Sequence, residues 1–356
     1  MDVLLHTILP FAGVLVVLIV VHELGHYITA KLTGVKVLEA GLGYPPRIWG
    51  FTFRGTLYSI NWLPLGGFVR LLGEEDPSDP ESLAAKPRWV RLVVLVSGSG
   101  MNFVLPVVLF AIAFMIPRDV NVGLTEITAV APGGPAEEAG LQPGDTIFEI
   151  NGDEVRNINE VGLAIRLNLG ETLDFTVKHK DGVLETVPVD ARWTPPSGQG
   201  PTGIQIANKY AFTEKESFAP WEALPKGWTA TLDSLILARN EVVTMFKGGS
   251  GPDVAGPVGI AQATGEIVEE SGWYTLLEFA ALLSINLAII NILPLPMLDG
   301  GRIAFVLLEI VRGGRRIAPE KEALVHLVGL ALIITFAVAV TYFDVIRIIR
   351  GESLFR

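Results

Sequence analysis

The sequence predicts a polytopic α-helical membrane protein of about four transmembrane helices that also carries one small α+β domain. Half of its 356 residues are apolar, and the mean hydropathy of +0.46 is far above what a soluble domain of this length needs. Four long apolar runs divide the chain, and a polar stretch separates the second from the third. The net charge of −11 argues against a nucleic-acid partner. Because there is no cysteine, any metal must be held by His, Asp or Glu.

Each apolar run can supply the roughly 20 residues with which a helix crosses the bilayer. The first has no Lys or Arg before Lys31, so it lacks the basic start of a cleavable signal peptide. The third is interrupted by Pro294, Pro296 and Asp299. Four runs in one chain argue strongly against the alternative of buried helices in a soluble core. We expect transmembrane helices at 1–31, 91–117, 275–311 and 323–346, the third of them broken.

The basic residues predict the orientation of the chain. They gather in the segments 32–90 and 312–322, and the positive-inside rule makes both segments cytoplasmic. The N-terminus, the region between the second and third spans, and the tail 347–356 would then lie outside. The tail disagrees mildly with this assignment, because it contains Arg347, Arg350 and Arg356.

The segment 120–207 is polar and has short alternating runs such as "DTIFEINGDEV", punctuated by Gly and Pro turns. Its stretch "ITAVAPGGPAEEAGLQPGDTIFEINGDEV" resembles the core of a PDZ domain. Such domains bind extended peptides at a sheet edge. We expect one extracytoplasmic PDZ-like α+β domain whose peptide-binding edge lies in "TGIQIA", at Gly203, Ile204, Gln205 and Ile206. In the alternative interpretation the domain is only a size filter over the membrane site.

The first apolar run contains "HELGH". On a helix His22 and His26 lie on one face and can reach one ion, while Glu23 lies beside them where a general base belongs. Catalytic zinc takes a third protein ligand and keeps one position for water. An unpaired Glu in a bilayer costs about 2.5–3.5 kcal/mol, so the cluster predicts an internal, hydrated site. The remaining histidines have no such pairing, and we expect structural or solvated roles for His6, His179 and His326.

The third ligand is expected in another span, and Asp299 is the candidate. It is the only charge between Glu278 and Arg302. The prolines before it break the helix, the two glycines after it free the backbone, and a broken helix at membrane depth is tolerated only where it lines a cavity. The alternative role is a helix N-cap at the membrane edge, and both roles are compatible.

"HELGH" at 22–26, together with "NILPLPMLDGG" at 291–301, resembles the site-2 protease family of intramembrane zinc metalloproteases, and within it the regulator-of-sigma-E branch with a single PDZ domain. The stretch "PLGGFVRLLGE" resembles the family's membrane-associated β-loop, and "GPVGIA" resembles its segment before the third span. The resemblance implies one Zn²⁺ held by His22, His26 and Asp299, with Glu23 taking the proton from the zinc-bound water. It also implies substrate contacts by an Asn near the LDG motif, for which Asn291 and Asn286 are candidates. Asn102 is a comparable candidate from the second span. Interhelical hydrogen bonding is the alternative role for Asn286 and Asn102.

A substrate helix hides its peptide bonds, so a protease must unwind it and replace its hydrogen bonds. The strand-like segment 57–72 contains Gly66, Gly67 and Phe68, and we expect it to offer an edge to the extended substrate. The linker 208–274 should contain an amphipathic helix with Trp221 and Trp228 at the membrane interface, or packed on the PDZ-like domain.

These observations predict an intramembrane zinc metalloprotease in a bacterial inner membrane, with its active site toward the cytoplasm. By resemblance its substrates are single-pass membrane proteins, such as anti-sigma factors or signal peptide remnants, already trimmed by an upstream site-1-type protease. The rival interpretation is a membrane-embedded PDZ adaptor with a structural or inactive metal site. Glu23 favours the enzyme, because an inactive relative has no need of a carboxylate there.

Overall fold

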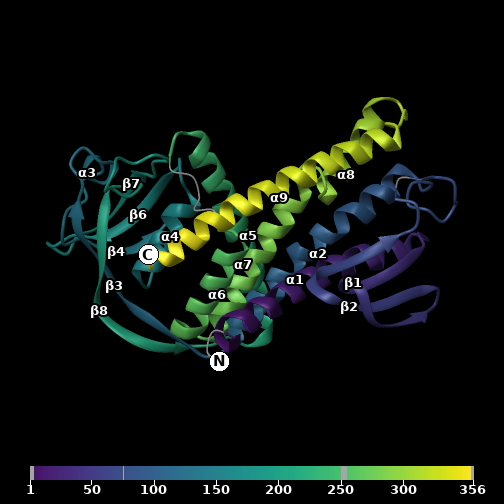
Figure 1. The fold of residues 1–356 in the computed structure, drawn as a ribbon. Coiled ribbons are helices and arrows are strands. Elements are labelled where there is room, and N and C mark those ends of the chain that lie inside the picture. The colour runs from purple at the N-terminus through teal and green to yellow at the C-terminus, as the bar shows by residue number, and fades with distance from the viewer. Residues whose placement is uncertain (1–3, 75, 250–254, 354–356) are drawn as a thin grey trace. The chain divides into compact units, whose positions relative to one another are not determined.

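The computed structural model describes residues 4–74, 76–249 and 255–353. The chain forms two compact units. The first comprises Met1–Ala113, Ala223–Thr231 and Val254–Arg356, and the second comprises Phe114–Glu222 and Leu232–Asp253. Long helices and a β-ribbon make up the first unit, and a sheet with short helices dominates the second (Figure 1).

Four helical segments of the described residues are long and apolar enough to cross a membrane, as predicted. They are Leu4–Leu32, which consists of a π-helical turn (Leu4–Ile8) and α1 (Leu9–Leu32), then α2 (Arg88–Met115), α7 (Trp273–Ile292) and α9 (Pro319–Ile349). Large apolar side chains such as Leu327, Leu332 and Phe336 are exposed along α9, which suits hydrocarbon and not water. The last helix continues beyond the predicted end at 346, and Arg356 lies outside the described residues.

The third span is broken where the prolines predict. After α7 ends, the loop 293–298 leads into α8 (Asp299–Val311). The two glycines let the first turn of α8 lie directly on this loop: an added Cβ would come 2.5 Å from the carbonyl oxygen of Ile292 at Gly300, and 2.5 Å from that of Leu295 at Gly301. Asp299 is the first helical residue, and Leu298 occupies the N-cap position, so the expectation of an Asp299 N-cap is wrong by one residue.

One helix of the first unit was not predicted. This helix, α6 (Pro257–Glu270), lies in the segment assigned to the linker and starts in "GPVGIA", with its proline at the first helical position. Asp344 of α9 is buried and accepts a hydrogen bond from the backbone N–H of Gly259 at 2.8 Å. A helix start leaves such donors unpaired, so the start of α6 depends on a carboxylate from a distant span.

The strands β1 (Val37–Phe53) and β2 (Thr56–Leu71) form a bent ribbon beside α1 (Figure 1). Residues 39–42 of β1 pair with 57–60 on one side and with 67–70 on the other. Within the described residues, the second half of β2 therefore has a strand on one side only and is a sheet edge. This edge lies on α1, since a Cβ added to Gly67 would be 3.3 Å from Ile19.

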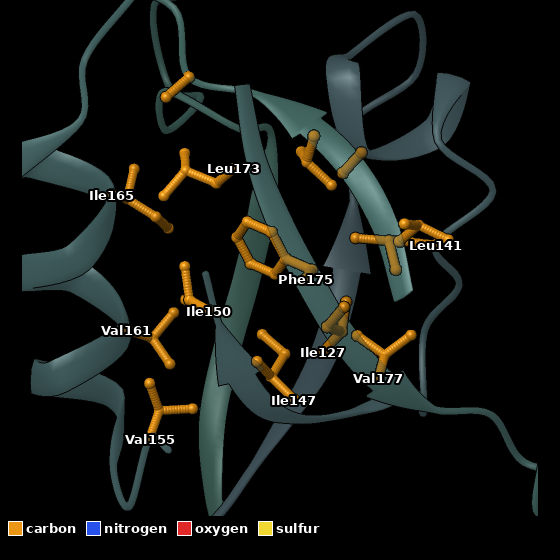
Figure 2. Close-up of a cluster of buried hydrophobic side chains, with 14 residues drawn as sticks. Ile127, Leu141, Ile147, Ile150, Val155, Val161, Ile165, Leu173, Phe175 and Val177 are labelled. Carbon is orange, nitrogen blue, oxygen red and sulfur yellow. The ribbon is translucent and has the colours of Figure 1, made fainter. Parts of the chain in front are cut away.

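The second unit is built on an antiparallel sheet of order β7-β6-β4-β3-β8, with β5 paired to β4. Its elements are β3 (Arg118–Val130), α3 (Pro135–Glu138), β4 (Thr146–Ile150), β5 (Asp153–Glu154), α4 (Ile158–Leu167), β6 (Thr172–Lys178), β7 (Leu184–Asp190) and β8 (Ile204–Glu216). Alternate residues Leu173, Phe175 and Val177 of β6 point into the core, where Val161 and Ile165 of α4 meet them (Figure 2). The sheet continues past the predicted boundary at 207, because β8 pairs with β3 as far as Glu216.

The expected amphipathic helix is α5 (Pro220–Phe246), whose residues are divided between the two units. Trp221 and Trp228 are exposed, as an interfacial helix requires. In its C-terminal half, Asn240 donates hydrogen bonds to the carbonyl oxygens of Arg166 and Leu167, at 2.8 and 3.2 Å. Packing on the second unit, the alternative raised from the sequence, therefore holds for this half.

Candidate metal centre

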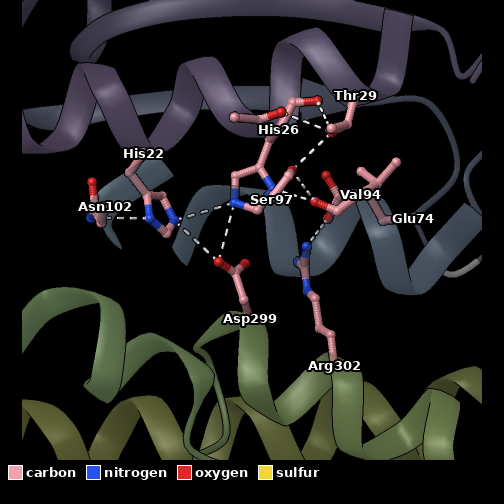
Figure 3. Close-up of polar contacts among 10 residues, drawn as sticks. His22, His26, Thr29, Glu74, Val94, Ser97, Asn102, Asp299 and Arg302 are labelled. Carbon is pink, nitrogen blue, oxygen red and sulfur yellow. Dashed lines mark hydrogen bonds and ion pairs between the residues drawn. The ribbon is translucent and has the colours of Figure 1, made fainter. Parts of the chain in front are cut away.

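The two histidines of α1 and the aspartate of α8 converge, as the sequence predicts (Figure 3). The Nε2 atoms of His22 and His26 lie 3.2 Å apart. Oδ2 of Asp299 lies 3.1 Å from each of them. The imidazoles are buried, because the helical spacing turns both rings toward α2 and α8. Two imidazole nitrogens and one carboxylate oxygen form the ligand set of a catalytic zinc site with a position left for water.

The Nδ1 atom of each imidazole, on the side away from the centre, also has a polar neighbour on α2. The Nδ1 of His26 donates a hydrogen bond to the carbonyl oxygen of Val94 on α2, at 2.8 Å, which leaves its Nε2 as a free lone pair toward the centre. The Nδ1 of His22 lies 3.4 Å from the side-chain amide of Asn102, also on α2. Both rings are thus oriented with Nε2 inward, as metal ligation needs.

Asn102 supplies a test of whether this site fits a metal. Its side chain is 0% exposed, and its Oδ1 has no hydrogen-bond partner among the described residues. Turning the amide by half a rotation places Oδ1 against the His22 Nδ1. That nitrogen carries a proton when Nε2 is a ligand, so the orphaned acceptor is satisfied by a metal-bound tautomer. The sequence offered Asn102 as a substrate contact or an interhelical bond, and the geometry favours the bond.

Two glycines set the close approach of α1 to α2, and the sequence analysis missed both. A Cβ on Gly98 would lie 2.7 Å from Cε1 and from Nε2 of His22. A Cβ on Gly25 would lie 2.9 Å from the Met101 side chain. The signal was present in the small-residue run "SGSG" at 97–100, a pattern typical of tight helix contacts in membranes.

Glu23 is not part of the ligand cluster and lines a neighbouring cavity of about 370 Å³ between α1 and the β-ribbon. The edge strand passes beside it, because a Cβ on Gly67 would be 3.8 Å from the Glu23 Cγ. Aromatic side chains form much of the wall: Tyr27, Trp49, Phe51, Tyr58 and Phe68. The two phenol oxygens share a 2.5 Å hydrogen bond that raises the pKa of Tyr58 to about 12. The aromatic part of the wall is therefore uncharged near neutral pH.

The structure does not bring every predicted substrate residue into this cavity. Gly67 and Phe68 line it, whereas Asn286 of α7 is exposed and Asn291 is half-buried. Gly203, Ile204, Gln205 and Ile206 belong to the second unit. Gly203 directly precedes β8, and the other three lie in that strand. Among the described residues β8 ends the sheet order, so it offers an edge of its own.

Ion pairs at the base of α8 were not found from the sequence. Arg302, one turn after Asp299, pairs with Glu74 (Figure 3). Farther along the helix the buried Glu309 accepts a 2.6 Å hydrogen bond from the buried Arg91 of α2. These pairs fix α8 relative to α2 and to the end of the β-ribbon. Their partners are too far apart in sequence for any local pattern to reveal them.

Comparison with known proteins agrees with this arrangement. Residues 10–336 match the model of peptidase family M50. The zinc metalloproteases RasP of Oceanobacillus iheyensis and Geobacillus kaustophilus are each 30% identical to this chain over 96% of its length, covering 99% and 98% of their own. A protein of Clostridium perfringens, whose name provisionally describes a zinc metalloprotease, is 34% identical over 92% of this chain and 95% of its own.

Zinc is therefore the cofactor, and the four apolar helices agree with a membrane protein. The chain belongs to peptidase family M50, the site-2 protease family, and is a zinc metalloprotease.

Proposed function

We propose that this zinc metalloprotease hydrolyses peptide bonds within the transmembrane segments of single-pass membrane proteins. The observation that carries the proposal is the convergence of His22, His26 and Asp299. The two histidines lie in the first apolar span, and Asp299 is the first residue of α8, which follows the loop after the third span. Two ligands inside an apolar span are a reason to expect the reaction at membrane depth. Ionisable groups at that depth cost free energy, so they are rare there and mark functional sites.

In the proposed reaction His22, His26 and Asp299 hold the zinc. When bound, zinc supplies a Lewis acid that polarises a carbonyl and lowers the pKa of water toward neutrality. The Glu23 carboxylate takes a proton from the attacking water and delivers it to the leaving amide nitrogen. Glu23 lies outside the ligand cluster and lines the adjoining cavity, so its carboxylate is not needed as a ligand and can serve this transfer.

The proposed substrate site is the cavity beside Glu23. A transmembrane helix must be unwound before cleavage, and residues 67–70 of β2 present an edge to which an extended chain can add. Such a strand would turn alternate side chains toward the aromatic wall formed by Tyr58 and Phe68. The cavity of about 370 Å³ is at the lower end of the range for ligand sites and suits large apolar side chains. Asn291 and Asn286 are the further substrate contacts that the family resemblance implies.

We assign the second unit to a single PDZ-like domain on the extracytoplasmic side. Residues 204–206 of β8 pair with β3 on one side, and β8 is the last strand in the sheet order. A peptide terminus released by an upstream site-1-type protease could add at this edge, from Gly203 onward. A size filter is the alternative.

The proposed orientation has the metal centre toward the cytoplasm of a bacterial inner membrane, and the basic segments 32–90 and 312–322 support it. The proposed substrates are those that the family resemblance implies, anti-sigma factors or signal peptide remnants.

The test is cleavage of a reconstituted single-pass substrate at matched zinc occupancy. We expect the wild type to cut, o-phenanthroline to stop it, and Glu23→Gln to keep zinc while its rate falls by about 10²- to 10⁴-fold. Asp299→Asn should lose zinc. Glu270→Gln, an exposed carboxylate at the end of α6, is the matched control and should cut normally.

Two results would count against the proposal. Equal cleavage by wild type and Glu23→Gln would remove Glu23 from the reaction. A wild type that holds zinc but cuts none of a panel of single-pass segments would favour the rival class, a PDZ adaptor with an inactive metal site.

A further inference from the structure

His326 lies in α9, more than one turn inside the fourth span, and contacts the loop that carries Asp299. Its ring is buried. Its Nδ1 accepts a hydrogen bond from the backbone N–H of Met297 at 2.8 Å. Met297 is two residues before Asp299, so this bond holds the backbone just ahead of the carboxylate.

The loop 293–298 needs this hydrogen bond because Met297 has a left-handed backbone conformation. Its φ is +74°, which side chains other than glycine rarely adopt. Strained positions of this kind persist only where the surroundings determine them, and they gather at functional sites. The hydrogen bond to His326 is a contact made by the strained residue itself.

Two further contacts place α9 against the same loop. At Gly329, one turn after His326, an added Cβ would lie 3.0 Å from Cγ and 3.1 Å from Cα of Pro296. Glu322, one turn before His326, has its Oε1 4.0 Å from the His326 Nε2. A carboxylate at that distance favours the tautomer with hydrogen on Nε2, which leaves Nδ1 as the acceptor that Met297 needs.

We infer that His326 is a positioning residue of the metal centre: through the Met297 N–H and the Pro296 contact at Gly329, the fourth span sets where Asp299 meets the two histidines. This inference rests on the proposed role of Asp299 as a zinc ligand. It replaces the structural or solvated role that the sequence indicated for His326. It also gives α9 a function beyond anchoring the chain in the bilayer.

The experiment measures zinc affinity by chelator competition, and the optical spectrum of the cobalt-substituted protein, on full-length variants in detergent. His326→Leu removes the acceptor and should weaken zinc binding by about 10- to 100-fold, the usual effect of losing a partner that orients a ligand. His326→Asn keeps an acceptor oxygen near the Nδ1 position and should stay within about threefold of wild type. Gly329→Ala, which drives the loop away without touching the histidine, should weaken zinc like His326→Leu.

A second variant tests the strain directly. Glycine adopts positive φ without a steric cost, so Met297→Gly should depend less on the bond to His326. Combined with His326→Leu, it should restore part of the lost zinc affinity. Leu327→Ala, on the exposed neighbour of His326, is the control that should leave affinity and spectrum unchanged.

Asp299→Asn distinguishes a failure of the proposed ligand set from a failure of the positioning role of His326. If Asp299→Asn keeps full zinc affinity, the proposed ligand set is wrong. If Asp299→Asn loses zinc while His326→Leu and Gly329→Ala bind it normally with an unchanged cobalt spectrum, only the positioning role of His326 is overturned. The same holds if His326→Asn loses as much affinity as His326→Leu, because the acceptor is then not what matters. A lower thermal stability with unchanged zinc affinity would mark His326 as structural only.

Discussion

Substituting Gly98 by alanine should disable the metal centre, although alanine is the better helix former. The added Cβ would lie 2.7 Å from Cε1 and from Nε2 of His22. That is about 0.7 Å short of the 3.4 Å at which ordinary contact begins. Nε2 of His26 would lie closer still to the added Cβ. Both imidazoles or the whole of α2 must therefore move by at least this amount, and a displacement near 1 Å can cost about 100-fold in rate.

The stability change can be worked out separately from the functional change. An alanine in place of glycine within a helix gains about 0.8–1.0 kcal/mol, while forcing a methyl into a filled interior costs about 1–3 kcal/mol. The net loss in free energy of unfolding should then be at most about 2 kcal/mol, so the variant stays folded. Gly100→Ala is the matched control on the same helix, because a Cβ there meets nothing within 4 Å.

The assay is zinc content after purification, together with cleavage of a reconstituted single-pass substrate and thermal unfolding in detergent. We expect Gly98→Ala to retain less zinc and to lose about 100-fold in rate, and Gly100→Ala to match or exceed wild-type stability with full activity. The prediction is refuted if Gly98→Ala holds zinc and cuts like the wild type, because the imidazole would then tolerate a methyl group that the distances in the structure exclude.

Three further predictions follow from other contacts. Gly67→Val should lower turnover about tenfold or more with zinc unchanged, because its Cβ would lie 3.2 Å from the Gly41 carbonyl oxygen and 3.3 Å from Ile19 on the proposed substrate edge; unaltered cleavage would contradict a substrate site there. Glu309→Leu should cost about 3–5 kcal/mol because the buried Arg91 loses its partner. Adding Arg91→Met should recover most of that loss in thermal unfolding. The hydrogen bond to Asp145 raises the pKa of His179 above its ordinary 6.5, so this pair stabilises the second unit fully below about pH 6.5 and loses its effect as pH rises through the raised pKa. His179→Gln should flatten that part of the stability profile, and an unchanged slope would exclude the pair as its cause.

Much of the fold could be predicted because it is encoded in local periodicity. Hydropathy alone located the four spans, and the alternation in "TLDFTVK" matches the inward side chains of β6. The spacing of His22 and His26 fixed them to one face of α1, and the lone charge and prolines of the third span singled out Asp299. Each of these signals lies within one continuous stretch of sequence around the residue that it describes.

Only the tertiary structure decided which residues support the site. Asn102 meets a histidine 80 positions away, and His326 meets Met297 across 29. Gly98 matters only because α2 crosses α1 opposite the imidazoles. The helix α6 was missed for the same reason, since its first turn is completed by Asp344 of another span. Local sequence determines which face of an element is buried, but the partner on that face depends on how distant elements cross, and no spacing along the chain records the crossing.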